Sequence, residues 1–588
     1  MHLSTSGPSV LGALALASTA VAETAPSAGS AQDLFLKRIL AQSDDYGELF
    51  DNSPQEAHNL TVGIIGGGAA GLYAALLLES LDIDYEILES SERIGGRIFT
   101  HRFNPTAWEA SEPGQPDYYD YYDAGAMRFP GMEWMDRIIG EKNNSLVSYI
   151  NSKVQPKDQV NLIPYYFQAN NTFRLFNDIL AYNQENPSAE TFEVLVSDGG
   201  TIEDDAFAAL SPGDVFHDEV EALINALTED FDTGFQLLMQ YDSVSVRQYL
   251  LQQGYSHQQV DWIETIADAT THYDTFALSE AVMEQWIFHQ SPLDSWTCVE
   301  GGMDRIVNGM VKTLARQVET GKRVTAIKSA DEGALTVVIN GEEERTYDHV
   351  ISTVPLGSLQ VIDLTELDLA YRKKVAIRKL QYDPAGKIGI KFKTRWWETL
   401  QSGTFQGGQS FSDLPIRRCV YPSYGLDIPD APGTMIASYT WGQDSARLGA
   451  YYTEDASRER IIDITIRNLA AMHNVTYEFL LSEYVDAHLW NWYEGEDAVG
   501  AFALFGPGEY STVLPALMAP GAHGRLHFAG EALSSGHGWI IGAVNSAYRT
   551  VAETLAVEQL DDKLFELVDK WGLVNEVDMG WYSQAFAS

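Results

Sequence analysis

Residues 60–99 read LTVGIIGGGAAGLYAALLLESLDIDYEILESSERIGGRIF, and this stretch carries the strongest structural signal in the chain. It opens with an apolar β-type run, turns through a glycine cluster, continues as an Ala/Leu-rich helical segment and enters a second apolar run that ends in Glu89. This order of strand, glycine turn, helix, strand and acid is typical of a dinucleotide-binding βαβ unit, in which the acid accepts hydrogen bonds from a ribose 2′-OH. A glycine-rich turn in another kind of α/β protein is the alternative interpretation.

The turn and the helix start have separate physical roles in such a unit. Gly66 permits the tight turn, Gly68 lets backbone N–H groups approach a pyrophosphate, and Gly71 lets the helix pack closely on the strand. The helix N-terminus, at Ala69 and Ala70, provides favourable charge for the phosphates.

A second glycine pair narrows the choice of cofactor. Residues 91–97 read SERIGGR, directly after the acid that ends the second strand. Here the sequence resembles the flavin-dependent amine oxidase family, whose members have a GGR turn against the FAD diphosphate. The resemblance implies that role for Gly95, Gly96 and Arg97. Nicotinamide enzymes have no need of this second turn, so we expect FAD.

Length and charge restrict the class of protein. The chain has 588 residues, 45% of them hydrophobic and 11% aromatic, which is typical of a well-packed globular protein of several domains. Its formal net charge of −45 argues against binding to nucleic acid or to anionic membranes, since both would repel it.

Residues 1–22 are predicted to be a secretory signal peptide, because an apolar stretch ends in the small-x-small pattern Ala20-Val21-Ala22. That stretch is too short to span a bilayer. Residues 23–57 suggest a helix and a linker, with a short propeptide left open. We expect a secreted, extracellular glycoprotein. Four Asn-x-Ser/Thr sequons fit this expectation: Asn59, Asn143, Asn170 and Asn474.

The sequence predicts neither a disulfide scaffold nor a metal site. Cys298 and Cys419 are too few for a disulfide scaffold, and they either pair with each other or remain buried thiols. The histidines are scattered, and we predict no metal site.

Arg128 stands among apolar residues, in the stretch AGAMRFP at 124–130. A buried guanidinium is costly alone, so it requires an internal acid or an incoming anion. The L-amino-acid oxidases of the family have a similar G-x-M-R-x-P stretch, whose arginine holds the substrate α-carboxylate. The resemblance implies that Arg128 grips this carboxylate through two charge-assisted hydrogen bonds, and that Met127 and Arg128 border the cofactor. A pair between Arg128 and a nearby acid is the alternative.

The resemblance implies an α/β protein with a Rossmann-like FAD-binding domain of the amine oxidase type, a mixed-sheet substrate domain and a helical insertion. The expected boundaries are 58–130, 297–362 and 503–556 for the FAD-binding domain, 131–296 for the largely helical domain, 363–502 for the substrate-binding domain and 557–588 for a C-terminal helical tail.

Two further regions supply candidates. In the helical region, with helical stretches over 220–239 and 260–290, His272, Tyr273 and Trp286 are candidate pocket residues, although aromatic side chains at helical spacing more often belong to a core. In the strand expected at 322–329, the resemblance places the backbone of Val324 against the adenine. Asn340-Gly341, between two β-type runs, predicts a hairpin.

Lys387 begins a predicted strand, where a solvated edge charge is the default interpretation. In the family, however, a lysine followed by a β-run and an aromatic pair holds a water near flavin N5, and Lys387 matches that pattern. The strand at 435–441 resembles the one whose tyrosine gives a second carboxylate contact, which nominates Tyr439. Trp441 is two residues further on, so it faces the same side and is a candidate wall of the substrate pocket.

Residues 525–547, RLHFAGEALSSGHGWIIGAVNSA, form a second strong signature. In the family, the glutamate at Gly530-Glu531 meets the ribityl chain, and the backbone at Gly538, Trp539 and Ile540 opens a helix against the flavin. Gly538 and Trp539 would border the substrate. Some monoamine oxidases attach FAD through a cysteine in this loop, but none is present between 534 and 538, so we expect non-covalent FAD.

Together these motifs predict a secreted FAD-dependent L-amino-acid oxidase. It would convert L-amino acids and O2 to 2-oxo acids, ammonia and H2O2 by hydride transfer from Cα to flavin N5, with Arg128, Tyr439, Lys387 and Trp539 as the catalytic group. A monoamine or polyamine oxidase is the nearest alternative, and a non-catalytic flavin-binding protein is another. A homodimer is expected only by analogy with the family.

Overall fold

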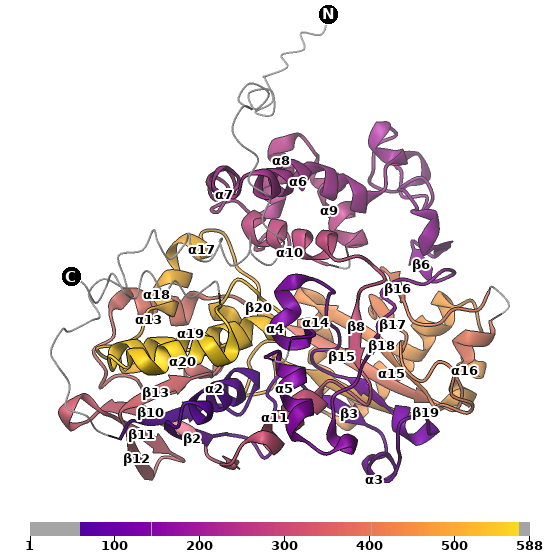
Figure 1. Cartoon of the computed structure of the whole chain (residues 1–588). Helices are drawn as coiled ribbons and strands as arrows, with labels where there is room; N and C mark the ends of the chain where they lie inside the picture. Colours follow the sequence, from indigo (N-terminus) through magenta and orange to yellow (C-terminus); the bar gives the residue numbers. More distant parts are fainter. Residues whose placement is uncertain (1–58, 143, 268, 401–402, 575–588) are drawn as a thin grey trace, which may run out of the picture.

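The computed structural model describes residues 59–142, 144–267, 269–400 and 403–574. The predicted signal peptide, the linker at 23–57, Asn143 and the end of the C-terminal tail lie outside these residues. The described chain contains two large sheets, and a layer of helices lies above them in the view of Figure 1. Within the described residues, no helix has both the length and the apolar character needed to span a membrane.

The first large sheet is parallel and contains the βαβ unit. Its strands, in spatial order, are β21 (Leu526–Phe528), β13 (His349–Ser352), β1 (Thr61–Ile65), β2 (Asp84–Leu88) and β9 (Val318–Glu319). The helix α2 (Ala69–Ser80) joins β1 to β2 and packs against α19 (Ile540–Val557) and α11 (Asp304–Thr313). Helices cover this sheet, so its strands are apolar runs rather than alternating ones.

An antiparallel sheet of three strands completes the nucleotide-binding region: β10 (Val324–Ser329), β11 (Leu335–Ile339) and β12 (Glu343–Tyr347). The turn between β11 and β12 contains Asn340 at φ 53° and Gly341 at φ 78°, both in the left-handed region. This confirms the hairpin predicted from Asn340-Gly341.

The second large sheet is mixed. Its strands, in spatial order, are β19 (Tyr484–Asn491), β15 (Ala385–Phe392), β18 (Gly433–Trp441), β17 (Arg418–Val420), β16 (Gln409–Ser412), β6 (Phe173–Phe176) and β7 (Ile179–Tyr182). All neighbours are antiparallel except β16 and β6, which are parallel. The strands β6 and β7 come from the region expected to be largely helical. They join this sheet because Phe173 and Leu175 pack into the apolar cluster beneath it.

The helical layer, drawn in magenta in Figure 1, consists of α6 (Pro212–Glu229), α7 (Phe231–Met239), α8 (Val246–Gln253), α9 (His257–Ile266) and α10 (Leu278–Gln290). The helical stretch expected over 260–290 is therefore interrupted between α9 and α10. Glu264 stabilises the interruption, because its carboxylate accepts a hydrogen bond from the Tyr273 backbone N–H at 2.7 Å and pairs with Arg247 at 2.9 Å.

Further strand pairs and helices complete the described fold. The strand pairs are β3 (Thr100–Arg102) with β4 (Tyr121–Asp123), β5 (Leu162–Pro164) with β8 (Thr297–Val299), and β14 (Tyr382–Asp383) with β20 (Phe502–Ala503). The further helices are α3 (Pro105–Glu109), α4 (Asp136–Ile139), α5 (Leu146–Lys153), α12 (Leu356–Leu359), α13 (Tyr371–Lys379), α14 (Gly442–Gly449), α15 (Asp455–Met472), α16 (Tyr477–Glu483), α17 (Glu509–Thr512), α18 (Leu514–Met518) and α20 (Asp561–Trp571).

Cys298 on β8 and Cys419 on β17 are both buried and free, so they do not pair.

Candidate active site

A cavity of about 830 Å³ is lined by residues of both large sheets and of α10. Apart from Gly71, every residue predicted to bind cofactor or substrate lines it. These residues are Gly66, Gly68, Ala69, Ala70, Glu89, Gly95, Gly96, Arg97, Met127, Arg128, Val324, Lys387, Tyr439, Trp441, Gly530, Glu531, Gly538, Trp539 and Ile540.

The glycine turn forms a backbone cradle at one end of the cavity. Gly66 has a φ of +110°, which favours glycine, and a Cβ at Gly71 would collide with the carbonyl oxygen of Gly66. Gly71 therefore lies behind the cradle, where it sets the close packing of α2 on β1. Gly68 precedes α2 without a side-chain capping bond, so the first N–H groups of the helix remain available to an anion.

Glu89 lies beside this cradle. One carboxylate oxygen accepts a hydrogen bond from the Gly67 N–H at 2.7 Å, and the other accepts one from the Ser91 N–H at 2.9 Å. The oxygen bonded to Gly67, Oε2, has a further lone pair for a ribose hydroxyl, whereas Oε1 also lies 2.7 Å from the Ser91 hydroxyl. The second glycine turn adjoins the first, because the Gly95 N–H donates to the Gly67 carbonyl at 2.9 Å.

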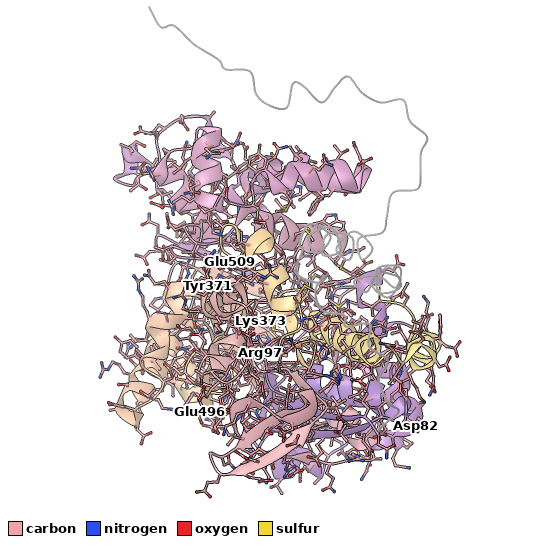
Figure 2. All side chains as sticks on the ribbon, turned by 90° about the vertical axis from the view of Figure 1, so that its left-hand side faces the viewer. Asp82, Arg97, Tyr371, Lys373, Glu496 and Glu509 are labelled. Carbon is pink, nitrogen blue, oxygen red and sulfur yellow. The ribbon has the colours of Figure 1, made fainter. Side chains whose placement is uncertain are left out.

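Arg97 and Glu531 join the second glycine turn to the loop before α19. Arg97 Nη1 lies 2.6 Å from Glu531 Oε1 and donates to the Ala501 carbonyl at 3.1 Å. The other Glu531 oxygen accepts a hydrogen bond from the Gly538 N–H at 3.1 Å. In the view of Figure 2, Arg97 is labelled near the centre of the molecule, and Asp82, in the turn after α2, is labelled at its edge. Arg97 is therefore a link between two cofactor-facing loops, in addition to any contact with the diphosphate.

These features fit an FAD molecule. The cradle and the α2 N-terminus suit the diphosphate, Glu89 and Val324 suit the adenosine end, and Glu531 and the start of α19 suit the flavin end. Within the described residues no cysteine lines the cavity, so a cysteinyl bond to the flavin has no residue to form it. The described residues also contain no group of three His, Cys, Asp or Glu side chains able to hold a metal ion.

Arg128 faces the cavity from the loop after β4. Its Nη1 donates a hydrogen bond to the Tyr165 hydroxyl at 3.2 Å, and its guanidinium carbon lies 4.8 Å from the ring centroid of Phe167 and 5.6 Å from that of Trp296. In the described chain, no ion pair engages this guanidinium. The alternative in which Arg128 is paired with an internal acid is thus not what the structure contains. Aromatic rings hold the guanidinium instead, and its charge remains available to a ligand.

Lys387 is buried on β15, between β18 and β19, which corrects the default expectation of a solvated edge charge. Its Nζ donates to the backbone carbonyls of Asp123 at 3.0 Å and Gly125 at 2.7 Å. Burial lowers the pKa of Lys387, and burial raises the pKa of the Asp123 carboxyl. A lysine with a lowered pKa exchanges protons more easily near neutral pH.

Tyr439 and Trp441 lie on β18, facing the cavity. Tyr439 is the direct cross-strand neighbour of Lys387, whose Nζ lies 4.8 Å from the tyrosine ring centroid. The rings of Tyr439 and Trp441 are 5.3 Å apart and nearly perpendicular. Arg418, the cross-strand neighbour of Tyr439 on β17, lies 4.6 Å from a ring centroid of Trp441. The lysine, the tyrosine and the two arginines thus surround one end of the cavity.

The helix α10 supplies acids that the sequence analysis did not identify. Glu280 and Glu284, one turn apart, both line the cavity. Glu280 pairs with His537 Nδ1 at 2.9 Å, and although burial opposes the charge, this pairing raises the pKa of His537. Burial raises the pKa of Glu284 to about 7. The i, i+4 spacing places the two acids on one face of the helix, but the sequence does not show that this face borders a cavity.

Of the three aromatic candidates in the helical region, two line the cavity and one does not. His272 and Tyr273 line the cavity, from the interruption between α9 and α10, whereas Trp286 is buried in a core cluster and does not. Burial lowers the pKa of His272 to about 4, so its contact with Asp383 at 3.6 Å joins a neutral imidazole to a carboxyl at neutral pH.

Comparisons with known proteins agree with this site. The family model for flavin-containing amine oxidoreductases matches residues 69–555. A Dictyostelium discoideum protein named "putative bifunctional amine oxidase" is 39% identical over 581 residues, which cover 94% of this chain but 52% of that protein. L-amino-acid oxidase 4 of the fungus Hebeloma cylindrosporum is 36% identical over 89% of this chain and 85% of its own length.

Solved structures show the same fold at low sequence identity. Cyclohexylamine oxidase from Brevibacterium oxydans superposes with a TM-score of 0.61 and 16% identity, covering 86% of this chain and all of that one. Putrescine oxidase superposes with a TM-score of 0.59 and 16% identity, covering 84% of this chain and 99% of that one. The chain therefore belongs to the flavin-containing amine oxidoreductase family, as an FAD-dependent oxidoreductase with the amine oxidase fold.

Proposed function

We propose that this protein is an FAD-dependent L-amino-acid oxidase, which converts L-amino acids and O2 to 2-oxo acids, ammonia and H2O2. The observation that carries the proposal is Arg128: a guanidinium that faces the cavity, held by aromatic rings, with no acid paired to it in the described residues. A substrate carboxylate would supply the missing negative charge.

The residues around Arg128 have complementary tasks. Arg128 binds the α-carboxylate, and Tyr439, across the strand pair from Lys387, provides a second donor. The amine must lose a proton before its lone pair can assist hydride loss from Cα. Lys387, with its lowered pKa and its buried position at the cavity, can hold or pass that proton. Bound FAD supplies the redox chemistry, accepting the hydride and reducing O2.

The nearest alternative is an oxidase of amines that lack a carboxylate. The names of the Dictyostelium relative and of the solved structures favour it. The name of the fungal relative favours the amino-acid interpretation. An amine substrate would leave the charge of Arg128 without a counterpart.

The test is anaerobic reduction of the bound flavin by matched pairs of substrates. Each pair differs only in the carboxylate: L-norleucine with pentylamine, and L-lysine with cadaverine. We expect the amino acid of each pair to bleach the flavin absorbance faster, and the D-enantiomers to be inert. Faster reduction by the amines would overturn the proposal in favour of an amine oxidase. An unbleached spectrum with every compound would indicate a flavin-binding protein without this catalysis.

A further inference from the structure

Glu284 is a cavity carboxylate that the proposed reaction leaves without a task. It follows Glu280 by one turn of α10, and both side chains line the cavity. Their partners differ. Both oxygens of Glu280 lie within 3.0 Å of His537 Nδ1, whereas Glu284 has no hydrogen bond or ion pair within the part of the chain that the structure describes. A carboxylate enclosed without a partner is costly, so this position suits a ligand group that supplies one.

Groups of both charges surround Glu284. Burial raises its pKa to about 7 and Glu280 adds to that increase, whereas Arg418 and Arg128 oppose it. Burial also raises the pKa of Asp383 to about 7, and Glu284 contributes to that shift. The cavity lining also includes the titratable groups His272, Tyr273, His537 and Tyr439. Glu284 therefore lies in the electrostatic neighbourhood of the proposed carboxylate clamp.

The positive charges near Glu284 are already engaged or assigned. Arg128 is the proposed clamp for the α-carboxylate. Arg418 donates a hydrogen bond from Nη1 to Gln409 at 3.2 Å and stacks between the rings of Phe411 and Trp441, at 5.0 and 4.6 Å. Glu280 compensates His537. On α10, Glu280 is already paired with His537, so Glu284 is the acid of this helix that remains for a substrate side chain.

We propose that Glu284 selects L-amino acids whose side chain ends in a cation, such as lysine, ornithine or arginine. This inference rests on the proposed function, because Arg128 must hold the α-carboxylate for the side chain to extend toward α10. A side-chain cation would pair with the Glu284 carboxylate through a charge-assisted hydrogen bond. An aliphatic side chain would lie against an enclosed charge, and an acidic side chain would be repelled.

The experiment compares L-lysine with L-norleucine, which has the same carbon skeleton without the terminal amine. The second-order rate constant for anaerobic flavin reduction is measured for the native enzyme and for Glu284→Gln, which keeps the size of the side chain and removes its charge. Glu221→Gln on α6 is the matched control, because it removes the same charge from an exposed position outside the cavity.

At pH 8 we expect the native enzyme to favour lysine over norleucine by about 10- to 100-fold, and Glu284→Gln to lose that preference. Glu284→Asp, which keeps the charge on a shorter stem, should retain part of it. The control should retain all of it. Flavin content and melting temperature identify any variant that fails to fold.

The pH profile separates this role from a structural one. Glu284 becomes protonated as the pH falls through about 7, so the lysine-to-norleucine ratio of the native enzyme should fall over that range. The ratio for Glu284→Gln should not change. An unchanged ratio in Glu284→Gln at pH 8 would overturn the assignment of Glu284 while leaving the amino-acid oxidase proposal intact. If cadaverine and pentylamine react faster than both amino acids, the proposal of an L-amino-acid oxidase itself fails.

Discussion

Replacement of Arg128 by methionine tests the carboxylate clamp directly. Methionine is unbranched and apolar, so it can occupy the space between Tyr165, Phe167 and Trp296 without leaving an unpaired charge. The substitution removes one donor to the Tyr165 hydroxyl and no ion pair found in the described residues. We therefore expect the folded enzyme to bind FAD and to melt within a few degrees of the native protein.

The expected loss of activity follows from the removed contacts. A carboxylate bound through two charge-assisted hydrogen bonds in an enclosed cavity loses about 3–5 kcal/mol of transition-state binding when the guanidinium is removed. At about 1.4 kcal/mol for each factor of ten, kcat/KM for L-norleucine should fall by about 150- to 4,000-fold. Pentylamine has no carboxylate, so its kcat/KM should change by less than about 5-fold.

The assay follows H2O2 release and, independently, the flavin difference spectrum during titration with benzoate, a carboxylate that cannot be oxidised. Arg128→Met should weaken benzoate binding. Arg467→Met on α15 is the control, since Arg467 is exposed and pairs only at the surface with Asp463. A loss below about 10-fold for norleucine, with FAD bound, would refute the clamp. Equal losses for norleucine and pentylamine would indicate that Arg128 acts on the flavin or the fold.

Four further outcomes are expected. Gly71→Ala should give a protein that melts lower and retains little FAD, because the added Cβ meets the Gly66 carbonyl and overpacking costs about 1–3 kcal/mol. Lys387→Met should slow turnover by about 100-fold, measured by stopped-flow in both half-reactions with the melting temperature as control; an unchanged rate would exclude proton transfer through this lysine. Asp383, whose folded-state pKa is raised to about 7, destabilises the fold increasingly as the pH rises from about 4 to 7, so Asp383→Asn should stabilise the protein by up to about 3 kcal/mol more at pH 8 than at pH 5 in denaturant titrations. Expression in a secreting host should yield a mature N-terminus after residue 22, and Edman sequencing that finds Met1 would contradict the predicted leader.

The nucleotide-binding region was predictable because its constraints are local. The glycines at 66, 68 and 71, the following helix and Glu89 all lie within one βαβ unit, so their spacing alone defines the cradle. The direction of Arg128 was expected only by family resemblance. Its aromatic partners at 165, 167 and 296 come from other parts of the chain, and no local pattern connects them to Arg128.

Long-range pairing explains what local patterns do not show. Position in the strand alone makes Lys387 an edge residue, and only the family resemblance nominated it for the site. It is buried because β19, about a hundred residues later, covers the far side of its strand. The interruption before α10 has neither glycine nor proline between 267 and 277, and its local loop signal is the weaker run of Asp and Thr residues over 268–275. Glu284 received no assignment from the sequence, since its exposure to the cavity depends on residues of both large sheets that line the same cavity.

The residues proposed to act in the reaction and the acid proposed to select the substrate lie on different elements, and this has an evolutionary consequence. The lysine, the tyrosine and the cofactor cradle belong to the two sheets and their adjoining loops, whereas Glu280 and Glu284 belong to one helix of the overlying layer. On the assignment of Glu284 made above, substitutions within a single turn of that helix would change which amino acids the enzyme oxidises. The lysine, the tyrosine and the cofactor cradle would not have to change with them.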